Sequence, residues 1–133
     1  MVILAVLVDD DEGLCECLIP VLKDLTNVQV IDVAQTPTDA ISLIAKYELD
    51  WELLILDIDL RNGSGLDVMT SCQKRLPHQH VFVLTNMSTP FIRGRCHDLG
   101  VDAVFDKTTE LDKFFDHCKN FKTLSYEFKK YRQ

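Results

Sequence analysis

The sequence predicts a doubly wound α/β domain built on a five-stranded parallel sheet. Five short apolar runs alternate with segments whose apolar residues recur at helical spacing. The runs are apolar at consecutive positions, as expected of strands that helices cover on both faces. The 133 residues, of which 47% are hydrophobic, suit one domain with its own core. Right-handed crossovers then bring the carboxyl ends of the strands to one edge of the sheet.

Each expected strand is short and rich in β-branched residues and leucine. The strands are Ile3 to Val8, Val28 to Val33, Leu53 to Leu56, Val81 to Leu84, and Val101 to Phe105. Because a helical pattern separates each strand from the next, these segments form βα units rather than hairpins.

An amphipathic helix is expected after each strand. The first presents an apolar stripe at Leu14, Leu18, Val21, Leu22 and Leu25. The second begins at Thr36-Pro37, because threonine caps a helix and proline fits its first position. The third follows Gly63-Ser64 and extends as far as Leu76. The fourth runs from Thr89-Pro90 to Gly100, where a left-handed cap needs glycine.

The composition excludes several classes of function. A net charge of -7 at pH 7 argues against a nucleic-acid partner, because proteins that follow a phosphate backbone carry a basic face. The cysteines favour packed, reduced thiols in a cytoplasmic protein over a disulfide framework, because they are odd in number and lie in apolar stretches. They are Cys15, Cys17, Cys72, Cys96 and Cys118. No apolar stretch has the length of a membrane span, so no membrane partner is expected.

Polar residues follow four of the expected strands. They are Asp9-Asp10-Asp11 after the first, Asp57 after the third, Thr85-Asn86 after the fourth, and Asp106-Lys107 after the fifth. Carboxylates that converge in apolar surroundings need a cation, and hard oxygen ligands suit Mg²⁺. A lysine and a threonine hydroxyl beside that metal complement a phosphoryl group. Taken singly, Thr85 and Lys107 are ordinary structural residues. The four strand ends together predict a site for a metal and a phosphate-like anion.

Four segments resemble the receiver domain of bacterial response regulators, the family of the chemotaxis regulator. They are VLVDDDE (6 to 12), LLILDIDLRNGSGLDV (53 to 68), VFVLTN (81 to 86) and DAVFDK (102 to 107). The resemblance implies a (βα)5 flavodoxin-like receiver fold over residues 1–120. It also leads us to expect a stand-alone, single-domain response regulator, because no effector sequence follows.

The resemblance implies a role for each acidic residue. Asp57 would be the phosphoacceptor. Asp9, Asp10 and Asp57, together with the backbone carbonyl of Asp59, would hold Mg²⁺ or another divalent cation such as Mn²⁺. Asp11, in contrast, is expected to cap or flank the first helix, where negative charge is favourable.

The remaining site residues bind or tune the phosphoryl group by the same resemblance. Thr85, Asn86 and Lys107 would contact the group and report its presence to the surface. The side chain of Asp59, with Met87 and Val104, would tune the reaction at the entrance.

The sequence departs from the family pattern at three positions. Thr108 and Arg61 stand where the family often has proline, so a trans Lys107-Thr108 bond is expected. Val104 stands where an aromatic ring often responds to activation.

The expected function is that of a phosphoacceptor in a two-component system or phosphorelay. The donor would be a sensor histidine kinase or a histidine phosphotransfer protein, the target an unknown downstream protein, and no small-molecule turnover is expected. Two alternatives stay open. A haloacid dehalogenase-like phosphohydrolase also has Asp-x-Asp after a strand, although here the motif follows the third strand. A phosphorylation-independent interaction module would fit the departures at Val104 and Thr108.

The fifth helix begins near Thr108-Thr109, and its apolar spacing continues into the carboxyl-terminal segment. The stripe there consists of Phe121, Leu124, Phe128 and Tyr131. Residues 119–133 carry a net charge of +4, from Lys119, Lys122, Lys129, Lys130 and Arg132 against Glu127. We interpret residues 121–133 as a basic amphipathic extension suited to a partner or a homodimer, or as a solvated tail.

The four histidines show no shared spacing. They are His78, His80, His97 and His117, and they are expected in loops or on helix surfaces. A phosphoaspartate mechanism needs no imidazole in this chain.

Overall fold

Strands and helices alternate along the chain, as the sequence predicts. The computed structural model describes the backbone of residues 2–132 and the side chains of residues 2–121. The large sheet consists of β1 (Ile3–Val8), β2 (Val28–Ala34), β3 (Leu53–Leu56), β6 (His80–Thr85) and β7 (Ala103–Asp106). Its strand order is β2-β1-β3-β6-β7, with every neighbouring pair parallel. The winding reverses between β1 and β3, which confirms the doubly wound fold.

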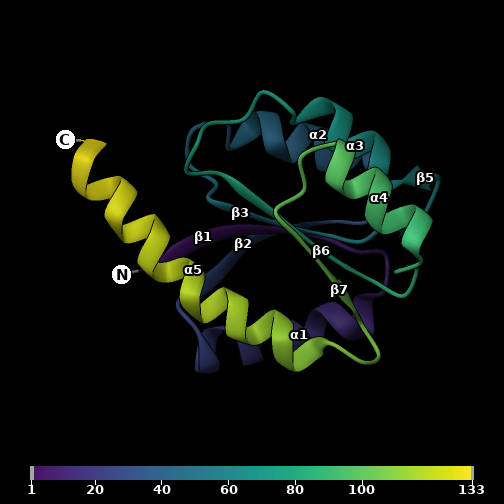
Figure 1. Ribbon diagram of the computed structural model, residues 1–133, viewed down its shortest axis with the longest axis horizontal. Coiled ribbons are helices and arrows are strands. Elements are labelled where there is room, and N and C mark those ends of the chain that lie inside the picture. Colours follow the sequence, from purple (N-terminus) through teal and green to yellow (C-terminus); the bar gives the residue numbers. More distant parts are fainter. Residues whose placement is uncertain (1, 133) are drawn as a thin grey trace.

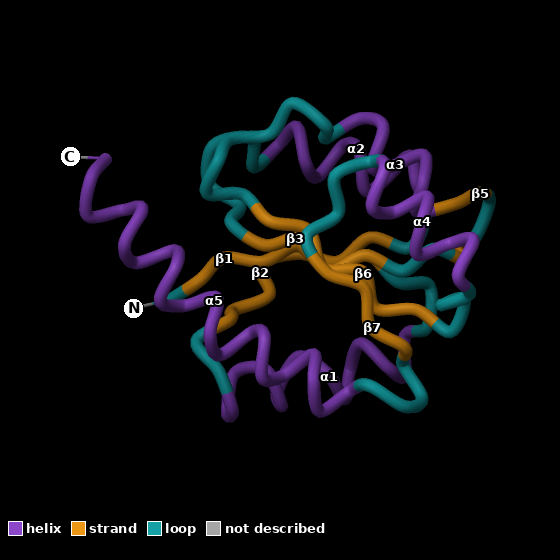
Figure 2. The backbone as a smooth tube through the Cα atoms, viewed as in Figure 1, coloured by secondary structure: helices purple, strands orange, loops and turns teal. Residues whose placement is uncertain are grey.

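Five helices cover the two faces of this sheet. They are α1 (Glu12–Leu25), α2 (Pro37–Lys46), α3 (Gly65–Ser71), α4 (Pro90–Asp98) and α5 (Leu111–Arg132). Figure 1 shows α1 and α5 on one face and α2, α3 and α4 on the other. The three layers are also plain in the tube view of Figure 2. Each face buries its own apolar cluster, because the consecutive apolar residues of β1, β3 and β6 point alternately to the two sides.

Local signals place the helix starts where they were predicted. The side chains of Asp11, Thr36, Ser64 and Thr89 each accept a hydrogen bond from a backbone N–H in the first turn of α1, α2, α3 and α4. Gly100 adopts a left-handed φ of 84° after α4, as expected of a glycine at the end of a helix.

Two helix boundaries differ from the prediction. Helix α3 ends at Ser71, so Leu76 lies outside it and is 36% exposed. Arg75 accounts for this early end, because its guanidinium donates to the carbonyls of Cys72 (3.3 Å) and Gln79 (2.9 Å) and holds the chain in a turn. Helix α5 begins at Leu111 rather than near Thr108.

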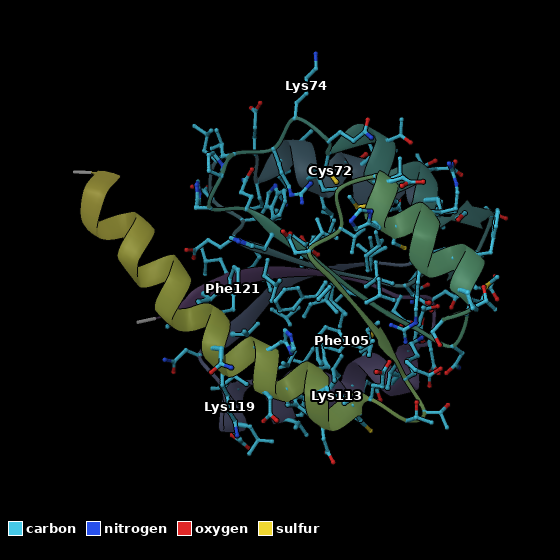
Figure 3. The ribbon with its side chains drawn as sticks, in the orientation of Figure 1. Cys72, Lys74, Phe105, Lys113, Lys119 and Phe121 are labelled. Carbon is cyan, nitrogen blue, oxygen red and sulfur yellow. The ribbon has the colours of Figure 1, made fainter. Side chains whose placement is uncertain are left out.

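One of the four histidines differs from the prediction, because His80 lies on β6 with its ring 4.7 Å from that of Phe121. His78 lies in a turn before β6, as expected, and is buried at 2% exposure. His97 and His117 are exposed on α4 and α5, as expected. Figure 3 shows Phe105 and Phe121 between α5 and the sheet, so the rings of His80 and Phe121 belong to this aromatic packing.

The cysteines are free thiols, as predicted. Cys15, Cys72, Cys96 and Cys118 are buried, whereas Cys17, two residues from Cys15 on α1, is exposed. In the part of the chain that the structure describes, no helix is both long enough and apolar enough to cross a membrane.

The carboxyl-terminal part of α5 extends past the sheet (Figure 1). Phe121 is the last side chain described, and it is buried at 1% exposure. The side chains predicted to continue its stripe, Leu124, Phe128 and Tyr131, lie outside the described residues, as do those of the basic residues from Lys122 onward.

Candidate functional site

The site lies at the carboxyl edge of the sheet, where the winding reverses. Asp9 follows β1 and Asp57 follows β3, and backbone hydrogen bonds fix both. The Asp9 N–H donates to the Ala34 carbonyl and the Asp57 N–H to the Val8 carbonyl, each at 2.9 Å. The two aspartates therefore end neighbouring strands side by side, as the sheet rule predicts.

Three carboxylates gather at this edge. Oxygens of Asp9, Asp10 and Asp57 all lie within 4.8 Å of one another. Asp9 is 3% and Asp57 5% exposed, whereas Asp10 is half-buried and reaches solvent. The structure thus brings together the three side chains predicted to ligate a metal.

Lys107 enters this cluster from the end of β7. Its Nζ lies 2.7 Å from Asp9 Oδ2 and 2.7 Å from Asp57 Oδ2, and its side chain is 13% exposed. Burial acts to lower the pKa of Lys107, but hydrogen bonds and charge from Asp57 and Asp9 outweigh it and raise that pKa above 10.5. Lys107 is therefore a fixed positive charge between the two buried carboxylates.

Burial still disfavours the charged form of Asp9 despite this cation. Burial raises the pKa of Asp9 above its usual 3.8, although the Lys107 ammonium and the Asp11 N–H act in the other direction. The Asp11 N–H donates to Asp9 Oδ1 at 2.9 Å, and the Ile58 N–H donates to Asp57 Oδ1 at 2.7 Å. Both oxygens of Asp57 are thus held in place, one by Ile58 and one by Lys107.

A small hairpin after Asp57, which the sequence did not predict, forms one side of the site. Strands β4 (Asp59–Leu60) and β5 (Gly63–Ser64) pair antiparallel, and Asn62 between them adopts a positive φ of 64°. The hairpin returns to the site at Gly65, where a Cβ would lie 2.1 Å from the Asp57 carbonyl oxygen. Only glycine allows this approach, so Gly65 lets the hairpin close on the phosphoacceptor position.

The side chains of Thr85, the last residue of β6, and of Asn86 make hydrogen bonds to residues outside the acidic cluster. The buried Thr85 hydroxyl accepts from the Met87 N–H at 3.0 Å, and the Asn86 side-chain oxygen accepts from the Thr108 hydroxyl at 3.2 Å. The Lys107 N–H donates to the Thr85 carbonyl at 3.0 Å, which ties the end of β6 to that of β7.

The three predicted tuning residues differ in exposure. Asp59 is exposed at the start of β4, and Met87 is 41% exposed. Val104 is partly buried against the apolar cluster under α2, α3 and α4. Arg61 donates from its guanidinium to the side chain of Gln35 at 3.2 Å. The Lys107–Thr108 bond is trans, as expected without proline, because the described residues contain no cis bond.

Asp11 and Asp106 have structural contacts. Asp11 caps α1, as predicted, through a 3.0 Å bond from the Leu14 N–H. Asp106 Oδ1 accepts from the N–H groups of Thr108 (2.7 Å) and Thr109 (3.0 Å), and this turn explains why α5 starts later than expected.

The sequence did not predict the polar contacts of Arg93 at this edge of the sheet. Arg93 of α4 contacts Ser88, Val104 and Glu110. No spacing rule connects these residues, because they are brought together only by the position of α4 beside β7 and the loop before α5.

The donor set suits a hard divalent cation. Three carboxylates against one ammonium leave an excess of negative charge, and Mg²⁺ prefers a few carboxylate oxygens with remaining positions open to water. Asp9, Asp10 and Asp57 are the residues that would hold it. The fold and this site define a class: doubly wound α/β proteins with an acidic pocket where the winding reverses.

A comparison with known families identifies the member of this class. The response regulator receiver domain matches residues 5–119, and the chain belongs to that family. It is therefore a phosphoacceptor domain of two-component signalling and not an independent enzyme. This finding sets aside the haloacid dehalogenase-like phosphohydrolase.

Individual relatives are more distant. The response regulator protein VraR of Staphylococcus aureus is 27% identical over 116 residues, which cover 87% of this chain and 54% of VraR. The VraR of Staphylococcus epidermidis is 28% identical over the same shares. The chain thus spans about half the length of the curated relatives it matches.

Solved receiver domains have the same fold. The non-phosphorylated HemR receiver domain from Leptospira biflexa has a TM-score of 0.78 at 27% identity, over 90% of this chain and 93% of that one. A DNA-binding response regulator of the LuxR family from Staphylococcus aureus has a TM-score of 0.80 over 90% of this chain and 98% of that one. Its 19% identity supports the likeness of fold alone.

Proposed function

We propose that this protein accepts a phosphoryl group on Asp57 and passes the signal to a protein partner in the cytoplasm. The donor would be a phosphohistidine on a sensor histidine kinase or on a histidine phosphotransfer protein. One observation carries the proposal: the Asp57 carboxylate is fixed at the end of β3 beside two further carboxylates and a buried ammonium.

The side chains around Asp57 supply orientation and charge. In the transfer, one Asp57 oxygen bonds to phosphorus while the P–N bond of phosphohistidine breaks, and the ring nitrogen keeps the electron pair. The Ile58 N–H holds the carboxylate plane, so the nucleophile does not have to be ordered during the reaction. Lys107 turns its ammonium from the carboxylates to the arriving phosphoryl oxygens and neutralises part of their charge.

A divalent cation completes this charge balance. Asp9, Asp10 and Asp57, with the backbone carbonyl of Asp59, would hold Mg²⁺ or Mn²⁺. When bound, the cation supplies charge neutralisation for the transferring phosphoryl oxygens.

Residues after β6 would report the phosphorylated state. The Thr85 hydroxyl would donate its proton to a phosphoryl oxygen, and Asn86 would move with it. The exposed side chains of Asp59 and Met87 would set the access of water. Val104 stands where the family often has an aromatic reporter and would not report the state in that way. The phosphoaspartate would then reorder the loop that leads into α4.

The receiver domain is proposed to comprise residues 1–120, with residues 121–133 as a basic amphipathic extension. The net charge of +4 over residues 119–133, on a chain of -7, suits contact with an acidic partner or a second copy. The expectation of a stand-alone domain stays a prediction.

Intact mass measurement after incubation with acetyl phosphate and Mg²⁺ tests the phosphoacceptor. Wild type should gain one phosphoryl group, and Asp57→Asn should gain none. Asp50→Asn is the matched control, because it makes the same chemical change at an exposed side chain before β3, at the opposite end of that strand from Asp57, and should still be labelled.

The same measurement distinguishes a phosphoacceptor from a phosphorylation-independent interaction module. If Asp57→Asn is labelled like wild type, the assignment of Asp57 is wrong. If wild type is never labelled yet binds its partner as tightly as Asp57→Asn does, the protein is a phosphorylation-independent interaction module.

A further inference from the structure

Two loops at the carboxyl edge of the sheet are joined residue by residue. One loop, residues 86–89, leads from β6 to α4; the other, residues 107–110, leads from β7 to α5. The joining bonds are Lys107 N–H to Thr85 carbonyl (3.0 Å), Thr108 Oγ1 to Asn86 Oδ1 (3.2 Å) and Ser88 Oγ to Asp106 Oδ2 (2.5 Å). A shift of the first loop therefore has to break these bonds or move the second loop with it.

Arg93 fastens this pair of loops to α4. Its Nε donates to the Ser88 carbonyl (3.1 Å), its Nη1 to the Val104 carbonyl (3.2 Å) and its Nη2 to Glu110 Oε1 (2.5 Å). The same Glu110 oxygen accepts from the Asp106 N–H at 3.0 Å. We call Arg93, Ser88, Val104 and Glu110 the Arg93 clasp. The planar guanidinium suits this task, because it donates to three acceptors in fixed directions.

Helix α4 has few other attachments. Of its nine residues, only Ile92 and Cys96 are buried. Gly94 lies in its middle with nothing within 4 Å of the position of a Cβ, and glycine weakens a helix interior. The hydrogen bonds of Arg93 are therefore a main contribution to the stability of α4 and the preceding loop in this position.

The clasp joins α4 to the loop that follows Thr85, the last residue of β6. The Thr85 hydroxyl accepts from the Met87 N–H (3.0 Å), so the position of residues 86–89 affects where the Thr85 O–H can donate. We propose that Arg93 is a positioning residue for the phosphoryl response: it stabilises the resting position of residues 86–89, and the clasp opens when Thr85 turns to the phosphoryl group. This inference rests on the proposed function of Asp57.

The affinity for beryllofluoride, a phosphoryl mimic, tests this role. A ligand that prefers a minor state binds more tightly when the resting state loses stability. Arg93→Gln should therefore bind beryllofluoride about fivefold more tightly than wild type, by calorimetric titration in excess Mg²⁺, which corresponds to about 1 kcal/mol. A residue with only a structural role would leave the affinity unchanged or lower it when replaced.

Arg95→Gln is the matched control. It makes the same change of charge two residues along α4 at an exposed side chain, and should bind the mimic like wild type. Glu110→Gln is a second, independent variant, in case Arg93→Gln does not fold; it removes the negative charge opposite Arg93 and should also tighten binding. Because both residues belong to one contact, the effects of the two substitutions should not add in the double variant.

Each outcome decides the question. Unchanged or weaker binding in the folded variants, or an equal gain in Arg95→Gln, overturns the clasp while leaving the phosphoacceptor in place. Wild type that binds no beryllofluoride with Mg²⁺ refutes the proposed function, and the clasp with it.

Discussion

Replacing Lys107 with methionine should destabilise the protein by about 3 kcal/mol at pH 7 without divalent cations. Methionine keeps much of the length of the lysine side chain but removes the ammonium that lies 2.7 Å from both Asp9 and Asp57. The side chains of Asp9 and Asp57 are 4% and 6% exposed, so bulk water cannot solvate their charges. Removing one partner of a buried ion pair costs about 3–5 kcal/mol, and the low end applies because Asp9 can take up a proton.

The same reasoning predicts how Mg²⁺ acts on this variant. Without Lys107, three carboxylates share the site with no cation, so a bound divalent ion relieves more repulsion than it does in wild type. Urea unfolding in EDTA and in excess Mg²⁺ measures both effects, and the m-value should stay the same. A domain of typical stability survives this loss, so the variant should remain folded.

Lys113→Met is the control for this experiment. The Lys113 side chain is 70% exposed and its Nζ lies 3.6 Å from Glu110, so its loss should change the free energy of unfolding by less than about 0.5 kcal/mol. The reasoning is refuted if Lys107→Met is as stable as wild type in EDTA, or if Mg²⁺ stabilises the two proteins equally.

Three further substitutions test other parts of the structure. Gly65→Ala should lower the free energy of unfolding by about 3 kcal/mol, because its Cβ would meet the Asp57 carbonyl; a variant with wild-type urea stability would contradict this contact. Gly94→Ala should raise the free energy of unfolding by about 0.5–1 kcal/mol, because it improves an exposed helix position without a clash, and lower stability would show that α4 depends on this glycine. Hydrogen bonds from the Asp106 N–H and from Arg93 lower the pKa of Glu110 below 4.5. The charge of Glu110 therefore stabilises the fold above pH 4.5, and this contribution is lost as the pH falls through the pKa of the folded state. The difference in melting temperature between wild type and Glu110→Gln should therefore be constant near neutral pH and shrink below about pH 4.5; a constant difference down to pH 3 would contradict it.

Much of the candidate site follows from rules that apply to each segment separately. The apolar runs that end at Val8 and Leu56 predict buried parallel strands, and such strands share one carboxyl edge. Asp9, Asp57 and Lys107 could therefore be assigned to one site, and the structure brings them within hydrogen-bonding distance. Capping is local in the same way, so Asp11 and Thr89 were recognised without any knowledge of the fold.

The sequence by itself determined the order of strands and helices, the edge that bears the site and the charged residues gathered there, because these depend on local pattern and on general rules of parallel sheets. Tertiary structure alone decided the approach of Gly65 to the Asp57 carbonyl, the early end of α3 at Ser71 and the contacts of Arg93 with Val104 and Glu110. Each of these depends on the distance between backbone segments that are separate in the chain. No periodicity or motif encodes such a distance, because it results from the packing of all the elements at once.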